Sequence, residues 1–267
     1  TVLLTGFVAG ILYTGAQMLR VTPLILEAEK YEIAEIALPH SHVASGITHT
    51  HVLNGVALDV HQRVATPHEN LPAAHDHAGV AHATENWAPG DGAERTFYTA
   101  VSNIVTGIAF SLMLVAVFLL RGKTVDMNSG ILWGAAGFAV FALAPALGLP
   151  PELPGMTAAA LESRQVWWIG TVIATAIGIG LFTESKTILA KIAALALLAA
   201  PHLIGAPHPF LFESNVPAEL SAQFAIASLV TSAFFWFVLG GTSGYLYKKL
   251  VIESSSVLFK TSSLNPQ

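Results

Sequence analysis

The sequence contains no cysteine, and this absence excludes disulfide bonds, thiolate metal sites and cysteine-based catalysis. Charged residues are also scarce: they make up 11% of the 267 residues, whereas a soluble domain usually carries about a quarter. The formal net charge of −5 argues against nucleic-acid binding, which requires a basic surface. Together with 53% hydrophobic residues and a mean hydropathy of +0.61, these absences predict a protein that lies in a lipid bilayer.

Known catalytic signatures are missing as well. The H-x-x-x-H and H-x-x-H-H boxes of membrane di-iron enzymes do not occur, and neither does H-E-x-x-H, G-x-S-x-G or a phosphate-binding P-loop. We therefore expect that the chain is not an enzyme and does not hydrolyse ATP. A membrane metalloenzyme is the weaker alternative, because it would need a closed ligand set with one open coordination position, which the spacing alone does not supply.

Long apolar runs dominate the rest of the chain. A spanning helix needs about 20 predominantly apolar residues, and six stretches qualify: 1–19, 97–120, 130–149, 166–183, 188–205 and 224–247. The fifth is the weakest, since it contains Lys191 and Pro201, so five helices plus a re-entrant segment are the alternative. The first run resembles a signal peptide, but no clear cleavage site precedes Arg20, and we expect a retained helix.

These runs predict an all-α, polytopic membrane protein with six transmembrane helices. Its four parts are a first helix, an outer His-rich acidic segment, a five-helix membrane bundle and a cytoplasmic tail, at 1–19, 20–96, 97–247 and 248–267. Similar A-P-x-L strings at 144–147 and 200–203 suggest an internal repeat. From it we infer three helical hairpins, each built from two consecutive helices.

The distribution of charge predicts the orientation. Lysine and arginine occupy the short connections 121–129 and 184–187 and the C-terminal tail, which should therefore be cytoplasmic. The opposite side receives fourteen of the seventeen acidic residues but only five of the twelve basic ones. We expect a multi-pass protein of the cytoplasmic (inner) membrane, with its histidine-rich segment on the extracytoplasmic side.

Nine of the eleven histidines lie within residues 40–82. Imidazole binds borderline divalent metals, and histidine clusters without cysteine suit nickel, cobalt, zinc or copper(II). An H-x-H pair on extended chain places both rings on one face, so two such pairs can complete a four-ligand set. A solvated histidine-rich linker is the alternative. The predicted metal ligands in this segment are His40, His42, His49, His51, His75, His77 and His82.

A second group of polar residues is expected at the outer membrane boundary, where every predicted helix contributes to the same layer. Ionisable residues at membrane depth are costly and usually face a cavity or a partner. The predicted metal ligands in this layer are Glu27, Glu29, Glu152, His202 and His208. As an alternative, the arginines of this layer form interface salt bridges, with Arg20, Arg95 and Arg164 paired to Glu27, Glu94 and Glu162.

Several strings resemble the CbtA family of predicted cobalt transporter subunits. They are LRVTPLILEAE at 19–29, WAPGDGAERT at 87–96, APALGLPPELPG at 144–155, RQVWW at 164–168 and PHLIGAPHP at 201–209. The resemblance covers residues 1–247 in order, with a His-rich segment in the expected place. The polar positions that match are Arg20, Glu27, Glu29, Asp91, Glu94, Arg95, Glu152, Arg164, His202 and His208.

The resemblance implies a multi-pass protein linked to cobalt uptake for cobalamin synthesis, working with a small single-helix partner subunit that carries a histidine motif. Our hypothesis is a membrane subunit that captures a divalent cation on its outer face, with Co²⁺ favoured and Ni²⁺ or Zn²⁺ as alternatives. The rival hypothesis is a non-transporting membrane module that buffers metal or delivers it to a partner complex.

Overall fold

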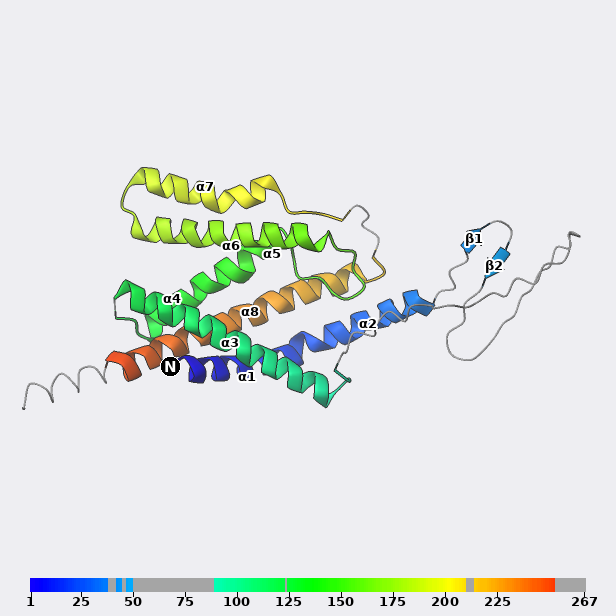
Figure 1. Ribbon diagram of the computed structural model, residues 1–267, viewed down its shortest axis with the longest axis horizontal. Coiled ribbons are helices and arrows are strands. Elements are labelled where there is room, and N and C mark those ends of the chain that lie inside the picture. The colour runs from blue at the N-terminus through cyan, green and yellow to red at the C-terminus, as the bar shows by residue number, and fades with distance from the viewer. Residues whose placement is uncertain (38–41, 45–46, 50–88, 123, 210–213, 253–267) are drawn as a thin grey trace, which may run out of the picture.

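The computed structural model describes residues 1–37, 42–44, 47–49, 89–122, 124–209 and 214–252. Helices account for most of these residues, with one pair of short strands (Figure 1). The elements are α1 (Val2–Arg20), α2 (Thr22–Ala37), β1 (His42–Ala44), β2 (Ile47–His49), α3 (Ala93–Arg121), α4 (Met127–Phe138), η1 (Ala139–Leu143), α5 (Ala144–Ala146), α6 (Leu161–Glu184), α7 (Ile188–Ile204), α8 (Ala218–Tyr247) and η2 (Lys248–Ile252). The all-α prediction is confirmed in this part of the chain, apart from β1 and β2.

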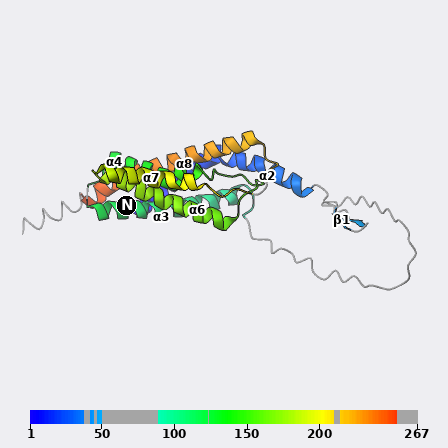
Figure 2. The ribbon, with the colours of Figure 1, turned by 90° about the horizontal axis from the view of Figure 1, so that it is seen from above.

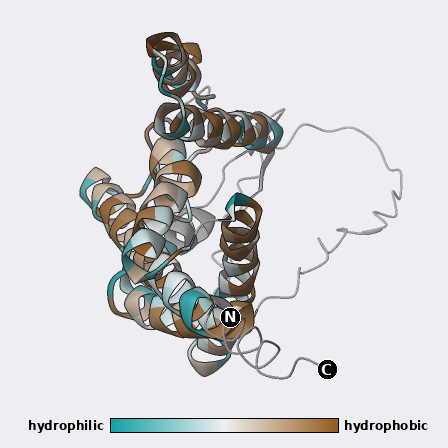
Figure 3. Cartoon of the chain, turned by 90° about the vertical axis from the view of Figure 1, so that its left-hand side faces the viewer, coloured by the Kyte–Doolittle hydropathy of each residue, from teal (hydrophilic) through white to brown (hydrophobic). Residues whose placement is uncertain are grey.

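Five helices of the described part are long and apolar enough to cross a membrane: Val2–Arg20, Ala93–Arg121, Met127–Ala146, Leu161–Glu184 and Ala218–Leu250. The fifth expected span, 188–205, exists as α7 but has only 17 residues, because Gly205, with a φ of 88°, ends the helix soon after Pro201. Large hydrophobic side chains such as Leu120 and Leu203 are more than 80% exposed. Hydrophobic residues accordingly cover much of the outward helix surface, as lipid contact requires (Figure 3).

The helices have two distinct ends. At the tail end, α3, α6 and α8 finish, and Arg121 and Glu184 form an ion pair of 2.7 Å that joins the ends of α3 and α6. At the loop end lie the connections 147–160 and 205–217. A hydrophobic cluster joins Leu153 and Val216 of these connections to Val21, Ala28 and Phe224. The long helices therefore run between the tail end and the loop end of the bundle (Figures 1 and 2).

Glycines set the closest helix contacts. A Cβ atom on Gly130 would overlap with the carbonyl oxygen of Gly240, and one on Gly134 would overlap with the carbonyl oxygen of Trp236. Gly6 and Gly107 bring α1 and α3 together in the same way. Small residues let helix backbones approach closely in membranes, where packing rather than hydrophobic burial drives association. The pairs α1–α3 and α4–α8 therefore form the compact part of the bundle.

The three predicted hairpins are only partly realised. α1 and α3 pack along their length, as the first hairpin requires. However, α4 packs mainly on α8, and α6 packs on α7 after the short turn at 185–187. Consecutive membrane helices need not pack, because the glycines of α4 find their matching surface on α8 rather than on α6.

The helix that begins with α4 changes its geometry before the loop end. In the π-helical segment η1, the N–H of Ala144 reaches back five residues to the carbonyl of Ala139. Pro145 follows in α5 and has no N–H to donate. Such irregular backbone is tolerated at membrane depth where it is buried in protein or lines a cavity. Residues of η1 and α5 do line a cavity, which is described below.

Replacing Asp126 with alanine is expected to lower the thermal stability of the detergent-solubilised protein, because Asp126 caps the N-terminus of α4. The backbone N–H of Ser129 donates to the Asp126 carboxylate at 2.9 Å and its hydroxyl at 2.8 Å, and these hydrogen bonds lower the pKa of Asp126. A carboxylate with a lowered pKa stabilises the folded state above its ordinary pKa, and this contribution is lost as the pH falls through the lowered pKa.

The difference in melting temperature between wild type and Asp126→Ala should therefore be full at pH 7 and shrink below about pH 4. Thermal unfolding at the two pH values measures it. An equal difference at both would contradict the capping role.

Candidate functional site

A cavity of about 850 Å³ lies between α6 and α8 at the loop end of the bundle. Its walls come from α1, η1, α5, the 147–160 connection, α6 and α8. Every helical residue that lines it belongs to the half of its helix nearer the loop end. Towards the tail end the glycine contacts close the space between α4 and α8.

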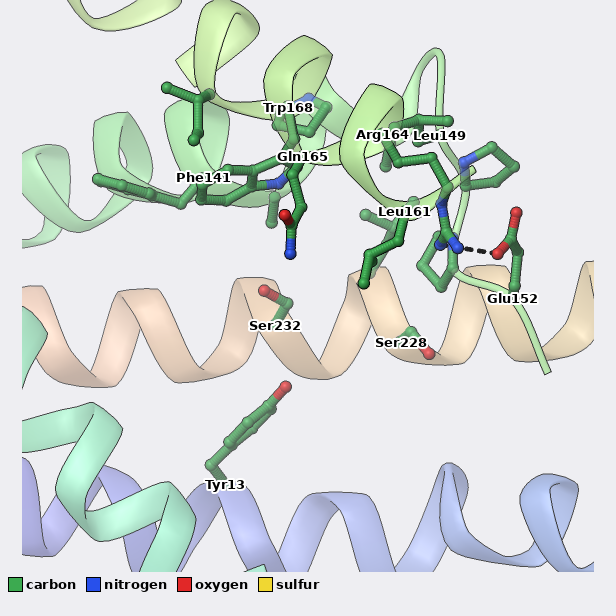
Figure 4. A pocket seen from close by; sticks show the side chains of 17 residues that line it. Tyr13, Phe141, Leu149, Glu152, Leu161, Arg164, Gln165, Trp168, Ser228 and Ser232 are labelled. Atoms are coloured by element: carbon green, nitrogen blue, oxygen red, sulfur yellow. Dashed lines mark ion pairs between the residues drawn. The ribbon is translucent and has the colours of Figure 1, made fainter. Parts of the chain in front are cut away.

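The cavity is apolar with a few polar groups at separate levels. Glu152 and Arg164 form an ion pair at its loop end (Figure 4). Farther in lie Tyr13, Gln165 and Ser232, together with Ser228. Apolar walls with few convergent polar groups are typical of a ligand site.

A buried hydrogen-bond network lies beside Tyr13 on α1. The amide nitrogen of Asn103 on α3 donates to the hydroxyl of Thr14 at 3.0 Å and to the side-chain oxygen of Gln17 at 2.6 Å. Gln17 is also one helical turn from Tyr13 on α1. Thr14 in turn donates to the carbonyl of Gly10 at 2.8 Å. Polar side chains in a membrane interior usually bind one another across helices. Here Asn103 of α3 binds Thr14 and Gln17 of α1 beside the cavity.

The charged pair at the loop end of the cavity is partly buried. Arg164 NH2 lies 2.8 Å from a Glu152 oxygen, and the two side chains are 31% and 22% exposed. The Nε of Arg164 is buried and has no hydrogen-bond partner among the described residues. The Nε of Arg164 therefore makes no hydrogen bond to the Glu152 carboxylate. The net charge of the ion pair is zero.

The other two predicted carboxylate ligands, Glu27 and Glu29, also form ion pairs with basic side chains. Glu29 lies 2.6 Å from Arg95, which also contacts Asp91 at 3.3 Å. Glu27 lies 2.6 Å from Lys30, and this hydrogen bond raises the pKa of Lys30. Both carboxylates belong to α2, and neither lines the cavity.

The predicted local salt bridges have different partners in the structure. Arg95 pairs with Glu29 rather than Glu94, and Arg164 pairs with Glu152 rather than Glu162. Residues one or two positions apart in a helix do not face each other, so these arginines reach carboxylates from other elements. The expected pairing of Arg20 with Glu27 is also wrong, since Glu27 pairs with Lys30.

The two predicted histidine ligands of the outer layer lie away from the cavity. His202 is exposed on α7 and packs its ring edge against Trp167, with ring centroids 6.0 Å apart. His208 is exposed in the following connection. Within the described residues, no group of three or more histidine and acidic side chains could hold a metal ion. Glu27, Glu29, Glu152, His202 and His208 thus share no ligand set in this structure, and their binding of metal stays a prediction.

Most of the histidine-rich segment falls outside the described residues. His40, His51, His75, His77 and His82 lie there, so their predicted role stays a prediction. His42 and His49 are within β1 and β2, where they are register partners in the antiparallel pair. This register places one histidine of the His40/His42 pair opposite one histidine of the His49/His51 pair.

The sequence prediction missed the polar residues deep in the cavity. Tyr13 and Ser232 lie in the apolar runs 1–19 and 224–247, which predict only membrane spans. Gln165 directly precedes the run 166–183 and is not among the predicted ligands. A signal exists for Gln165, which follows Arg164 near the start of a span, and for Asn103, an amide within an apolar run. No such signal identifies Tyr13 or Ser232, because tyrosine and serine are common in membrane helices.

A family model described as "Probable cobalt transporter subunit (CbtA)" matches residues 1–248. No curated protein and no solved structure was found to match the chain.

Proposed function

The chain belongs to the CbtA family of probable cobalt transporter subunits, and from that premise we propose that it takes up a divalent cation, with Co²⁺ as the favoured ion. Capture takes place on the extracytoplasmic side, where the loop end lies, and the tail end faces the cytoplasm. This orientation follows from lysine and arginine at the tail end. The membrane is the cytoplasmic membrane.

The cavity carries this proposal. It combines a charged pair at its loop end with polar groups on three membrane helices, and its lining belongs to the loop-end halves of those helices. That arrangement is what a transporter open to one side of the membrane requires. We assign the loop end of the cavity as the mouth and the glycine contacts of α4 and α8 as its closed floor.

We further propose that α7 crosses the membrane as a sixth helix. Its 17 residues rise about 25 Å, somewhat less than the hydrocarbon thickness of about 30 Å. However, α6 finishes at the tail end and α8 begins at the loop end, so α7 connects the two layers. The side chain of Trp167 supports this arrangement by donating to the carbonyl of Pro201 at 3.2 Å, which ties the loop-end parts of α6 and α7.

The histidine-rich segment is proposed to raise the local concentration of metal above the mouth. None of the described residues that line the cavity is a histidine. A small single-helix partner with a histidine motif would add the imidazole ligands that Co²⁺, Ni²⁺ and Zn²⁺ favour. This chemistry supports the expected partner. The proposed role in supplying cobalt for cobalamin synthesis rests on the family resemblance.

Metal uptake into proteoliposomes that contain the full chain tests the function, with Co²⁺, Ni²⁺ and Zn²⁺ in parallel and with or without the partner. We expect protein-dependent accumulation of Co²⁺ that increases with an inside-negative potential, because each charge gains about 2.3 kcal/mol per 100 mV. Protein-free liposomes are the control.

The alternative is a non-transporting membrane module that binds metal and delivers it to a partner complex. It predicts metal binding to the outside of the proteoliposomes without accumulation inside, both with and without the partner. That result would overturn the transport proposal.

A further inference from the structure

We propose that the interior of the cavity is a binding site for a hydrated divalent cation, which Tyr13, Gln165 and Ser232 hold through its water ligands. This inference rests on the proposed uptake function and specifies how the cavity holds its cargo. It differs from the sequence prediction, in which histidine and carboxylate side chains coordinate the metal directly.

The donor set of the interior carries the inference. Apart from Glu152, Arg164 and the indole of Trp168, the polar side chains among the described residues that line the cavity are Tyr13, Gln165, Ser228 and Ser232. All four are neutral hydroxyls or amides. Such groups are weaker ligands for Co²⁺, Ni²⁺ and Zn²⁺ than imidazole, and the described residues of the lining include no histidine or aspartate.

A cation in this interior has to keep its hydration shell. Transfer of a bare ion into an apolar environment is prohibitively unfavourable without strong compensating ligands. Six waters at about 30 Å³ each, with the ion, occupy roughly 200 Å³. A cavity of about 850 Å³ accommodates that complex.

The polar groups are placed to accept hydrogen bonds from such a shell. Waters bound to a cation donate outward, and the tyrosine, serine and glutamine oxygens all have acceptor lone pairs. Gln165 extends from α6 toward α8, where Ser232 lies, and the Tyr13 hydroxyl extends from α1 toward α8 (Figure 4). The ring of Tyr13 packs against Phe235 at 4.9 Å between centroids, and the network of Gln17 and Asn103 beside it contains no charged group.

Hexaamminecobalt(III) distinguishes this mode from direct coordination. Its ammine ligands do not exchange, and their N–H groups donate outward as metal-bound waters do. Equilibrium dialysis of this complex against the purified full chain therefore measures outer-sphere sites and not direct histidine coordination. We expect Gln165→Leu to weaken its binding about fivefold, the ratio for loss of one net hydrogen bond. Ser232→Ala should have a similar effect.

The matched control is Gln223→Leu, because Gln223 is an exposed glutamine on α8 outside the cavity. This variant should bind the complex as wild type does, and thermal unfolding shows that all variants are folded. In proteoliposomes, the complex should compete with Co²⁺ uptake, and Gln165→Leu should raise the half-saturating Co²⁺ concentration by the same factor.

The two proposals fail differently. Absence of uptake by the wild type would overturn the transport function, while the dialysis result would still decide the site. Uptake by the wild type together with equal hexaamminecobalt(III) binding by the Gln165→Leu and Gln223→Leu variants would overturn the site and leave transport intact.

Discussion

Replacing Gly134 with leucine is expected to prevent α4 from packing against α8 and to remove most of the folded protein. A Cβ atom at this position would overlap with the carbonyl oxygen of Trp236 and lie 3.2 Å from the Cα of Gly240. Neither group is a side chain that can rotate away. Ordinary overpacking of a core costs about 1–3 kcal/mol, and we expect a cost above that range because two backbones must separate.

The contact also supports the aromatic cluster beside it. Trp236 is 2% exposed and stacks on Phe141 at 5.5 Å with an angle of 9° between the rings. Phe141 belongs to η1 and lines the cavity. Separation of α4 from α8 would therefore displace the wall of the cavity as well as the floor.

The matched control is Gly180→Leu, because no atom lies within 4 Å of a Cβ built at Gly180 and the residue is exposed. We expect normal yields of monodisperse protein and a normal melting temperature for this variant. Gly134→Ala should fall between wild type and Gly134→Leu. Equal yields and melting temperatures for Gly134→Leu and Gly180→Leu would show that the close contact is not needed.

Neutralising either member of the Glu152–Arg164 pair is expected to change cation uptake in opposite directions. Glu152→Gln leaves Arg164 unpaired and should raise the half-saturating Co²⁺ concentration. Arg164→Gln leaves Glu152 unpaired and should lower it. One unit charge about 8 Å from a divalent cation, at an effective dielectric constant of about 20, changes the energy of the cation by about 4 kcal/mol. After screening by salt we expect about tenfold in each direction.

The double variant Glu152→Gln/Arg164→Gln decides what the pair does. If the pair acts through its charge, removal of both members restores uptake close to that of wild type. If Glu152 coordinates the metal directly, as the sequence predicts, the double variant should be as impaired as Glu152→Gln. Proteoliposome uptake over a range of Co²⁺ concentrations gives the half-saturating concentration of each variant.

Two exposed positions at the loop end serve as controls for the change in charge. Glu219→Gln and Arg20→Gln alter the net charge equally but lie outside the cavity. Their half-saturating concentrations should stay within about twofold of wild type, since exposed charges beyond about 10 Å are largely screened. Melting temperatures close to wild type would show that the cavity variants are folded.

The sequence predicts that arginines form salt bridges but does not identify their partners. The sequence correctly indicates that Arg95 and Arg164 form salt bridges, because an arginine at membrane depth needs a partner. It does not indicate which carboxylate is the partner. Glu29 is 66 residues from Arg95, and the two meet because α1, which leads into α2, packs against α3.

The sequence likewise predicts close helix contacts without identifying which helices pair. The glycines at 130, 134, 240 and 244 are visible in the sequence as two G-x-x-x-G patterns. Each pattern predicts a close contact but not the identity of the other helix. The A-P-x-L repeat favoured pairing of consecutive helices, whereas the structure pairs α4 with α8 and α6 with α7.

The sequence by itself determined the bilayer environment, the all-α class and the position of five spans, because each depends on the composition of a continuous stretch of chain. It also determined the family, through strings of matching residues along residues 1–248. Only the tertiary structure decided the cavity. Tyr13, Gln165 and Ser232 lie on three helices far apart in sequence, and the shape of a space between helices depends on how their surfaces fit, which no single stretch specifies.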